Sequence, residues 1–185
     1  MLSLRTVTPD TLELLKALMS APELLSLRLV GGTALALQYG HRVSVDLDLF
    51  GEVTIDKFEL LSLLQGLGEV RVINETKNIH QYFVNGIKVD IVNYPYSWID
   101  APIEDDSIRL ASPKDIAALK INAIEGRGTK KDFIDMYLLL QHYSLEEILT
   151  FYQQKYPDYS IFRALRSLTY FDDADDQIMP HMFVE

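Results

Sequence analysis

The sequence lacks cysteine altogether, and it has no long hydrophobic run. With no cysteine among its 185 residues, the chain has no disulfide framework, no cysteine-ligated metal site and no cysteine nucleophile. No stretch reaches the roughly 18 apolar residues that predict a transmembrane helix. The N-terminal residues also lack the basic start and unbroken apolar core of a signal peptide. These absences favour a cytoplasmic protein without a membrane partner.

Basic residues are scarce as well. The chain has 17 Lys and Arg against 27 Asp and Glu, which gives a net charge of −10. Nucleic-acid surfaces depend on Lys and Arg that neutralise phosphates, so this balance argues against extended duplex DNA as a partner. The basic residues are unevenly distributed, however, and one segment contains Arg109, Lys114, Lys120, Arg127, Lys130 and Lys131. A local basic patch on an acidic body suits a nucleoside triphosphate or one RNA end.

The chain length favours one domain, or one domain with a helical extension. Apolar patterns typical of strands occur up to about residue 110, and helical patterns follow from Ser112 onward. We therefore expect an α/β (α+β) core over residues 1–110, with a small mixed or antiparallel sheet and flanking helices. Residues 111–185 are expected to form a helical bundle that packs on the core and completes the site.

Capping and turn residues mark several element boundaries. Thr8 as N-cap and Pro9 at the first helical position predict the start of the first helix. Asn85-Gly86, between two alternating apolar arms, predicts a two-residue β-hairpin. Ser112, followed by proline, predicts the start of a later helix. The last dozen residues are expected to be frayed or dependent on a partner.

The most informative stretch is residues 29–50, LVGGTALALQYGHRVSVDLDLF. A short strand runs into Gly31, Gly32 and Thr33, and a helix is expected to begin at Thr33. Glycine lets the backbone approach phosphate oxygens and adopt positive φ, while the Thr33 hydroxyl can cap the helix and bond a phosphate. A helix that begins after a glycine turn offers its backbone N–H groups to a phosphate.

Apolar and polar residues then alternate from Arg42 to Phe50, which is typical of a half-buried strand. Alternate residues of a strand share one face, so Arg42, Ser44, Asp46 and Asp48 are expected side by side. Two adjacent carboxylates repel each other unless a cation neutralises them or one takes up a proton. Mg²⁺ is commonly held by one or two carboxylates plus substrate phosphates. Asp46 and Asp48 therefore predict a metal site beside the glycine turn.

This combination resembles the nucleotidyltransferase superfamily related to DNA polymerase beta, whose signature is a glycine turn, a helical spacer and an Asp-x-Asp or Asp-x-Glu. More narrowly, GGTALALQYGHRVSVDLDLF is similar to the first motifs of the abortive-infection toxin nucleotidyltransferases, the AbiEii/AbiGii family. The resemblance covers roughly residues 29–140. It implies a polymerase-beta-like core that binds a nucleoside triphosphate (NTP), with Arg42 and Ser44 near the nucleotide. Arg42 could reach a phosphate or pair with an acid, and Ser44 could simply bond backbone.

Asp90 is the candidate third carboxylate. It lies mid-strand in the apolar run IKVDIVNY, where an unpaired carboxylate is costly. Two Mg²⁺ ions, with Mn²⁺ as an alternative, can stabilise both oxygens of an in-line displacement at phosphorus. Asp46 and Asp48 would bridge the ions and Asp90 would bind one of them. The alternative is that Asp46 and Asp48 solvate an edge strand and that Asp90 pairs with Lys88 or an arginine.

A second group of candidates lies in the basic segment. The resemblance matches Lys120 to a helical lysine that contacts the triphosphate, and matches Lys131, Asp132 and Asp135 to a basic-Asp-x-x-Asp run that opens the next helix. Asp132 and Asp135 are three residues apart and so share one helix face. The helix dipole also favours acids at this position, which leaves a purely structural role open.

The function expected from these residues is a Mg²⁺-dependent nucleotidyltransferase that moves an NMP from an NTP to an acceptor. The resemblance implies an RNA, such as a tRNA, or a protein as acceptor, and a toxin that a cognate antitoxin restrains. The alternative is a catalytically inactive nucleotide-binding protein on the same fold. A metal-dependent phosphohydrolase is less favoured, because the chain lacks the His-rich ligand sets that such enzymes often use.

Overall fold

The computed structural model describes residues 1–183. In these residues the strands form one mixed sheet in the order β3-β4-β5-β2-β1-β7-β6. The strands are β1 (Arg28–Val30), β2 (Leu47–Gly51), β3 (Val70–Glu75), β4 (Ile79–Val84), β5 (Ile87–Asn93), β6 (Ile103–Asp105) and β7 (Ile108–Leu110). β2 runs parallel to β5 and antiparallel to β1, so the chain crosses over between the middle strands.

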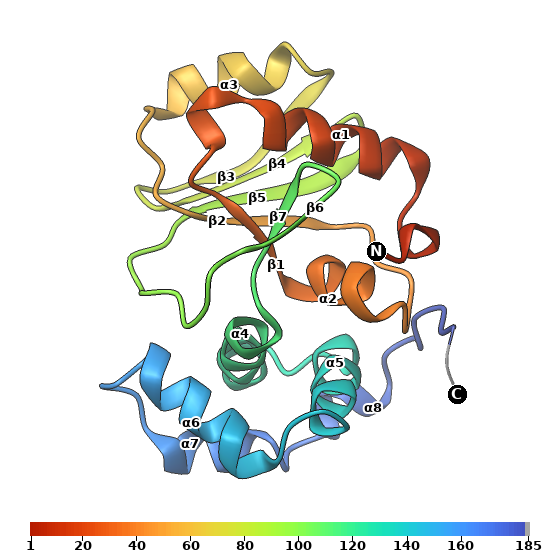
Figure 1. The fold of residues 1–185 in the computed structure, drawn as a ribbon, viewed down its shortest axis with the longest axis vertical. Coiled ribbons are helices and arrows are strands. Elements are labelled where there is room, and N and C mark those ends of the chain that lie inside the picture. Colours follow the sequence, from red (N-terminus) through yellow and green to blue (C-terminus); the bar gives the residue numbers. More distant parts are fainter. Residues whose placement is uncertain (184–185) are drawn as a thin grey trace.

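Helices cover the sheet on both sides (Figure 1). α1 and α3 lie above the strands in this view, and α4 and the helices after it lie below. The helices are α1 (Pro9–Ser20), α2 (Gly31–Tyr39), α3 (Lys57–Gln65), α4 (Pro113–Gly126), α5 (Lys130–Leu140), α6 (Leu145–Lys155), α7 (Ile161–Ser167) and α8 (Asp172–Asp175), with 3₁₀ turns at Leu4–Thr6 and Pro22–Leu24. No helix within residues 1–183 is long and apolar enough to span a membrane.

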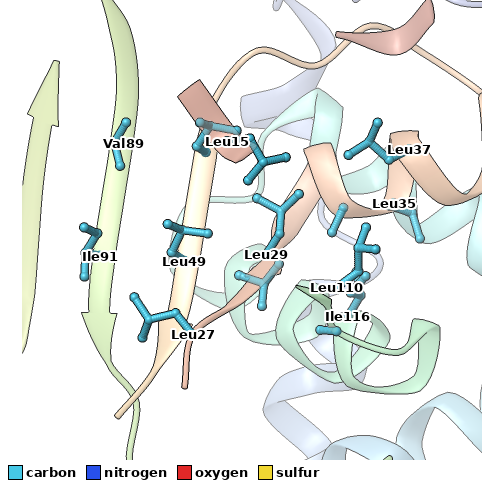
Figure 2. Packing of buried hydrophobic residues seen from close by; sticks show 14 of the residues in the cluster. Leu15, Leu27, Leu29, Leu35, Leu37, Leu49, Val89, Ile91, Leu110 and Ile116 are labelled. Carbon is cyan, nitrogen blue, oxygen red and sulfur yellow. The ribbon is translucent and has the colours of Figure 1, made fainter. Parts of the chain in front are cut away.

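The core joins the middle strands to the helices on either side (Figure 2). Leu29 of β1, Leu49 of β2 and Ile91 of β5 are at most 1% exposed. Leu15 of α1 and Leu35 of α2 pack into the same cluster. Complete burial of each such side chain contributes about 1.5–3 kcal/mol, so the core holds β2 and β5 firmly in register.

The structure confirms most of the helix starts that the sequence predicts. The Thr8 side chain accepts from the backbone N–H of Thr11 at the start of α1, and Ser112 does the same for Asp115 at the start of α4. The β4–β5 hairpin is also confirmed, with φ of 49° at Asn85 and 78° at Gly86. These left-handed angles at both central residues are what a type I′ turn requires.

The prediction of a strand from Arg42 to Phe50 is wrong for its first half. β2 begins only at Leu47, and residues 42–46 connect it to α2 apart from one isolated bridge between Arg42 and Met182. The reason is that the Arg42 side chain turns into the interior and the neighbouring backbone pairs with the C-terminal segment instead of the sheet. Arg42, Ser44, Asp46 and Asp48 therefore do not share one face of a strand, contrary to expectation.

The C-terminal segment up to residue 183 is not frayed, contrary to expectation. The N–H of Val43 donates to the His181 carbonyl at 2.8 Å, and the N–H of Phe183 donates to the His41 carbonyl at 2.8 Å. The Arg5 guanidinium lies over the Phe183 ring, 4.7 Å from its centroid. The part of that expectation that falls on residues 184–185 lies outside the described residues.

Candidate active site

Two of the predicted carboxylates lie side by side on neighbouring strands. Asp48 of β2 and Asp90 of β5 are direct partners in the parallel register of these strands. Adjacent strands are about 4.8 Å apart, and register partners project to the same face of a sheet. Asp46 lies one residue before β2, at the entrance to the same strand. The fold thus brings together acids that are more than forty positions apart in the sequence.

Burial and repulsion from neighbouring acids disfavour the charged form of Asp48. Burial, followed by the negative charges of Asp90 and Asp46, raises the pKa of Asp48 to about 6. The positive charges of Lys120 and Lys88 oppose the shift without cancelling it. A carboxylate in this condition is stabilised by any cation that binds beside it.

Only one of the two carboxylate oxygens of Asp90 accepts hydrogen bonds from the surrounding side chains. Its Oδ2 accepts from Gln81 Nε2 at 2.8 Å and from Lys88 Nζ at 3.1 Å. Its Oδ1 is buried and has no hydrogen-bond partner within the described residues. Pairing with Lys88, the structural alternative considered above, is therefore present on one oxygen. The other oxygen is left for a ligand, since an unsatisfied buried acceptor costs about 1–3 kcal/mol.

The two glycines before Thr33 have different structural roles. Gly31 has φ of +68°, and a Cβ there would lie 2.5 Å from Asp48 Oδ2, so only glycine lets α2 begin against this acid. A Cβ on Gly32 would instead overlap Arg42 Nη2. Gly32 is thus needed to seat a buried guanidinium, a role that sequence patterns do not show.

Thr33 is buried and holds the backbone that leads into β2. Its hydroxyl donates to the Asp46 carbonyl and lies 2.8 Å from Ser44 Oγ. The expectation that Thr33 caps the helix is wrong, because α2 begins at Gly31 with Val30 as N-cap and no side-chain cap. Thr33 and Ser44 position Asp46, and the first N–H groups of α2 remain available to an anion.

Asp135 is the centre of a buried ionic network. Its Oδ1 accepts from His41 Nε2 at 2.8 Å and from Arg42 Nε at 2.7 Å. Its Oδ2 accepts from Arg42 Nη2 at 2.8 Å and lies 2.6 Å from Lys120 Nζ. Burial alone would raise the pKa of Asp135, but Lys120, Arg42 and His41 hold it well below its usual range. Of the two roles left open for Arg42, the structure shows the pairing with an acid.

Asp132 links the same network to the edge of the site. It accepts from Lys120 Nζ at 3.0 Å and from Arg127 Nε at 2.9 Å, and it caps α5 through Thr129. Burial raises its pKa, yet the Arg127 and Lys120 charges and hydrogen bonds lower it well below the usual range. Asp132 and Asp135 thus hold cations in place, while Lys131 is exposed on α5.

A cleft of about 340 Å³ opens beside Asp48 and Asp90. Its apolar lining comes from Phe50, Val92 and Leu119, among others, and its polar lining includes Gly31, Asp48, Gln81, Asp90, Lys120, Asn122 and Arg127. Lys131 is not among the described residues that line it. A cavity of this size with a partly apolar wall and few charged groups is typical of a small-molecule site.

Arg127 lines the cleft although it is not among the site residues expected from the sequence. Its side chain is 64% exposed, and its pKa is raised chiefly by the hydrogen bond to Asp132, with further contributions from Asp48 and Asp46. Its position at the end of α4, with Nε and Nη2 bound to Asp132, brings a cation next to the acids. The sequence signals for it are the local excess of basic residues and its place at the start of the run, up to Asp135, that resembles the family's later motif.

The acids fit a hard divalent ion that arrives with phosphates. Within residues 1–183 no three His, Cys, Asp or Glu side chains form a ready-made metal cluster. Mg²⁺ does not need one, because it commonly binds one or two carboxylates and completes its shell with water and phosphate oxygens. The unpaired Asp90 Oδ1 and the raised pKa of Asp48 are the features that favour a cation here.

The sheet order, the glycine start of α2 and the paired acids define a nucleotidyltransferase of the polymerase-beta-like fold. The crystal structure of ANT(2″)-Ia in complex with adenylyl-2″-tobramycin aligns over 83% of this chain and 100% of its own, with a TM-score of 0.63 and 17% identity. JHP933 from Helicobacter pylori aligns over 88% and 90%, with a TM-score of 0.53 and 17% identity. The Megavirus polyadenylate synthase aligns over 71% and 30%, with a TM-score of 0.51 and 19% identity.

Within this class, the chain belongs to the family described as nucleotidyl transferase AbiEii toxin, type IV toxin–antitoxin system, whose model matches residues 13–177. An uncharacterised protein of Aquifex aeolicus (strain VF5) is 35% identical over 156 residues, which are 81% of this chain and 76% of the relative. The resemblance and the fold class expected from residues 29–140 are therefore confirmed, and the protein is a nucleotidyltransferase.

Proposed function

We propose that this protein transfers a nucleoside monophosphate from an NTP to a macromolecular acceptor with the help of Mg²⁺, and that it acts as a toxin. One observation supports the proposal above others. Asp48 and Asp90 face each other in register across two parallel strands, directly beside the uncapped start of α2. This arrangement offers carboxylates for a metal and backbone N–H groups for phosphates in the same cleft.

The cleft separates polar from apolar contacts in a way that suits an NTP. The triphosphate would lie at the start of α2, where Gly31 allows close approach, with Lys120 and Arg127 beside it. The base would lie against apolar side chains such as Phe50 and Leu119. Lys120 shares its charge with Asp132 and Asp135, so these two acids fix its position and do not contact the nucleotide themselves.

The chemistry is an in-line displacement at the α-phosphorus. A hydroxyl oxygen of the acceptor forms the new bond to the α-phosphorus and its proton passes to water. The bond from the α-phosphorus to the oxygen that bridges to the β-phosphate breaks, and pyrophosphate leaves with that oxygen. Mg²⁺ held by Asp46, Asp48 and Asp90 would stabilise the charge on the attacking and leaving oxygens. Asp132 holds Arg127 through Nε and Nη2 at the edge of the cleft, where the charge of Arg127 would offset the negative charge that develops on the departing pyrophosphate.

Structural neighbours with different acceptors show that the fold does not determine this partner. One was crystallised with an adenylylated aminoglycoside and another is a polyadenylate synthase. Because this chain belongs to a toxin family, we propose RNA or protein as its acceptor and a cognate antitoxin as its restraint.

Calorimetry with a non-hydrolysable NTP tests the nucleotide site. Wild-type protein should bind the analogue in the presence of Mg²⁺ and bind it much more weakly in EDTA. Asp48→Asn should remove the Mg²⁺ dependence, because the Asp48–Asp90 pair loses one charge. Equal affinity with and without Mg²⁺ in the wild type would show that the metal assignment is wrong.

Induced expression tests the toxin role separately. Wild-type protein should slow growth of the host, and Asp46→Ala should relieve the effect while leaving the fold intact, since Asp46 lies outside the buried core. Identical growth curves for the two would remove the toxin assignment and leave the nucleotidyltransferase fold untouched.

A further inference from the structure

The backbone of β5 directs the Asp90 side chain into the cleft. Its neighbours along the strand, Val89 and Ile91, are fully buried in the core beside Leu49 (Figure 2). Because successive residues of a strand point to opposite faces, the Asp90 side chain projects away from this cluster and lines the cleft. The strand thus sets the direction of the side chain, but it does not determine which carboxylate oxygen faces a ligand.

A glutamine on the next strand fixes the rotation of this carboxylate. Gln81 of β4 is the register partner of Asp90 on one side, and Asp48 of β2 is its register partner on the other. The three side chains therefore form a row across neighbouring strands (Figure 1). Gln81 Nε2 donates to Asp90 Oδ2 at 2.8 Å. The torsion that rotates a carboxylate has only broad preferences, so a donor held on one oxygen decides which oxygen remains for a ligand.

Both donors to Asp90 bind the same oxygen. Lys88 Nζ also lies on Oδ2, at 3.1 Å, whereas Oδ1 is buried and has no partner within residues 1–183. The two donors differ in charge. Lys88 repels a cation that binds at Oδ1, but Gln81 is neutral and occupies Oδ2 without that repulsion. Gln81 therefore holds the carboxylate in one orientation and leaves its negative charge available to a metal ion.

Coordination through a single carboxylate oxygen favours small cations over large ones. Mg²⁺ requires a near-octahedral shell at about 2.0–2.1 Å and keeps several waters. Ca²⁺ accepts about six to eight oxygens at about 2.3–2.6 Å and often takes both oxygens of one carboxylate. With Oδ2 occupied by Gln81 and Lys88, Asp90 can offer only Oδ1. The site as built therefore suits Mg²⁺ or Mn²⁺ better than Ca²⁺.

We propose that Gln81 is a positioning residue that restricts Asp90 to one-oxygen coordination and thereby makes the site selective for Mg²⁺ over Ca²⁺. The inference rests on the proposed function, which assigns a metal ion to these carboxylates. Gln81 also lines the cleft, so the competing role for it is a hydrogen bond from its amide to the nucleotide. That role predicts weaker NTP binding in a Gln81 variant and no change in metal selectivity.

Mn²⁺ binding followed by electron paramagnetic resonance, on the protein alone and with a non-hydrolysable NTP, tests this role. Mg²⁺ and Ca²⁺ are titrated as competitors, and the measured quantity is the ratio of the Ca²⁺ Kd to the Mg²⁺ Kd. Loss of a residue that orients a metal ligand typically weakens metal binding by about 10-fold or more, so Gln81→Leu should raise the Mg²⁺ Kd about tenfold. The Ca²⁺ Kd should change little, because both oxygens of Asp90 become available to the larger ion, and the ratio should therefore fall about tenfold.

Two further variants complete the test. Gln81→Asn keeps an amide but is one methylene shorter, so it does not reach Asp90 and should lower the ratio as Gln81→Leu does. The matched control is Gln153→Leu, which replaces an exposed glutamine on α6 and should leave the ratio at the wild-type value. Circular dichroism on each sample checks that the variants are folded.

The outcomes separate this inference from the proposed function. An unchanged ratio in both Gln81 variants overturns the inference, even if the affinities for both ions fall equally, because that result shows a purely structural role. Weaker binding of the NTP analogue with an unchanged ratio also overturns it and assigns the Gln81 amide to the nucleotide. A wild type that binds no Mn²⁺, either alone or with the analogue, refutes the metal assignment of the proposed function and this inference with it.

Discussion

Replacement of Asp135 with asparagine should destabilise the protein strongly, because this one carboxylate holds three buried groups. The side chains of His41, Arg42 and Asp135 are at most 3% exposed and that of Lys120 is 5% exposed. Asparagine keeps the shape but removes the charge, and its amide nitrogen would face donors. Removal of one partner from a buried ion pair costs about 3–5 kcal/mol, because the remaining charge stays in a poorly solvated site.

Urea denaturation measures this loss. At a typical m-value of about 2 kcal/mol/M for a small protein, the midpoint should fall by about 1.5–2.5 M. Asp132→Asn should lower the free energy of unfolding by less. The exposed Arg127 can then turn into water, and Lys120 still has its ion pair with Asp135. The control Asp176→Asn removes an exposed acid from the tail and should change stability by about 0.5 kcal/mol or less.

The same network predicts a defined response to acid. Asp135 has a pKa below its usual range in the folded protein and about 3.9 in the unfolded chain. Its contribution is therefore complete above about pH 5 and is lost as the pH falls through 3.9 toward the folded value. The difference in the free energy of unfolding between wild type and Asp135→Asn should narrow by about 1.4 kcal/mol per pH unit below about pH 3.9. Equal midpoints at pH 7, or a gap that stays constant down to pH 3, would refute the reasoning.

Three further changes have definite expected outcomes. Asp48→Asn should abolish transfer yet raise the free energy of unfolding in EDTA at pH 7.5, by roughly 1–3 kcal/mol in urea titrations; the gain should shrink as the pH falls through about 6 and vanish below about pH 4, because the wild-type acid is then protonated in both the folded and the unfolded chain. Gly31→Ala should lose activity and about 1–2 kcal/mol of stability, since alanine is disfavoured at φ of +68° and its Cβ meets Asp48; wild-type kinetics would contradict this. Lys120→Ala should weaken NTP binding in calorimetry and lower the thermal midpoint, because Asp132 loses its buried cation; unchanged binding would remove Lys120 from the nucleotide site.

The local signals of the chain were sufficient for most of the core. The hairpin at Asn85-Gly86 is encoded by two residues that tolerate positive φ, and once it forms, the register of β5 follows. The β6–β7 hairpin could not be predicted in the same way, because Asp106 and Ser107 adopt positive φ without a glycine to mark the turn. Asparagine and glycine carry a turn signal that aspartate and serine carry only weakly.

Long-range contacts explain why the site was only partly predictable. Arg42 and Asp135 are 93 positions apart, so periodicity cannot show that Arg42 turns inward and ends the expected strand. The sequence predicts Gly32 as part of a phosphate-binding turn, and what the structure shows is that Gly32 makes room for that guanidinium. Short-range patterns locate acids and glycines, whereas the partners of buried charges depend on how the helices pack on the sheet.

A double-label transfer assay tests the central claim most directly. The wild-type protein is incubated with Mg²⁺, total RNA or cell lysate, and each NTP labelled at either the α- or the γ-phosphate. Nucleotidyl transfer predicts that the α-label becomes attached to a macromolecule, that the γ-label appears in pyrophosphate, and that EDTA or Asp48→Asn prevents both. Attachment of the γ-label, or no transfer of either label from any NTP, would contradict the account.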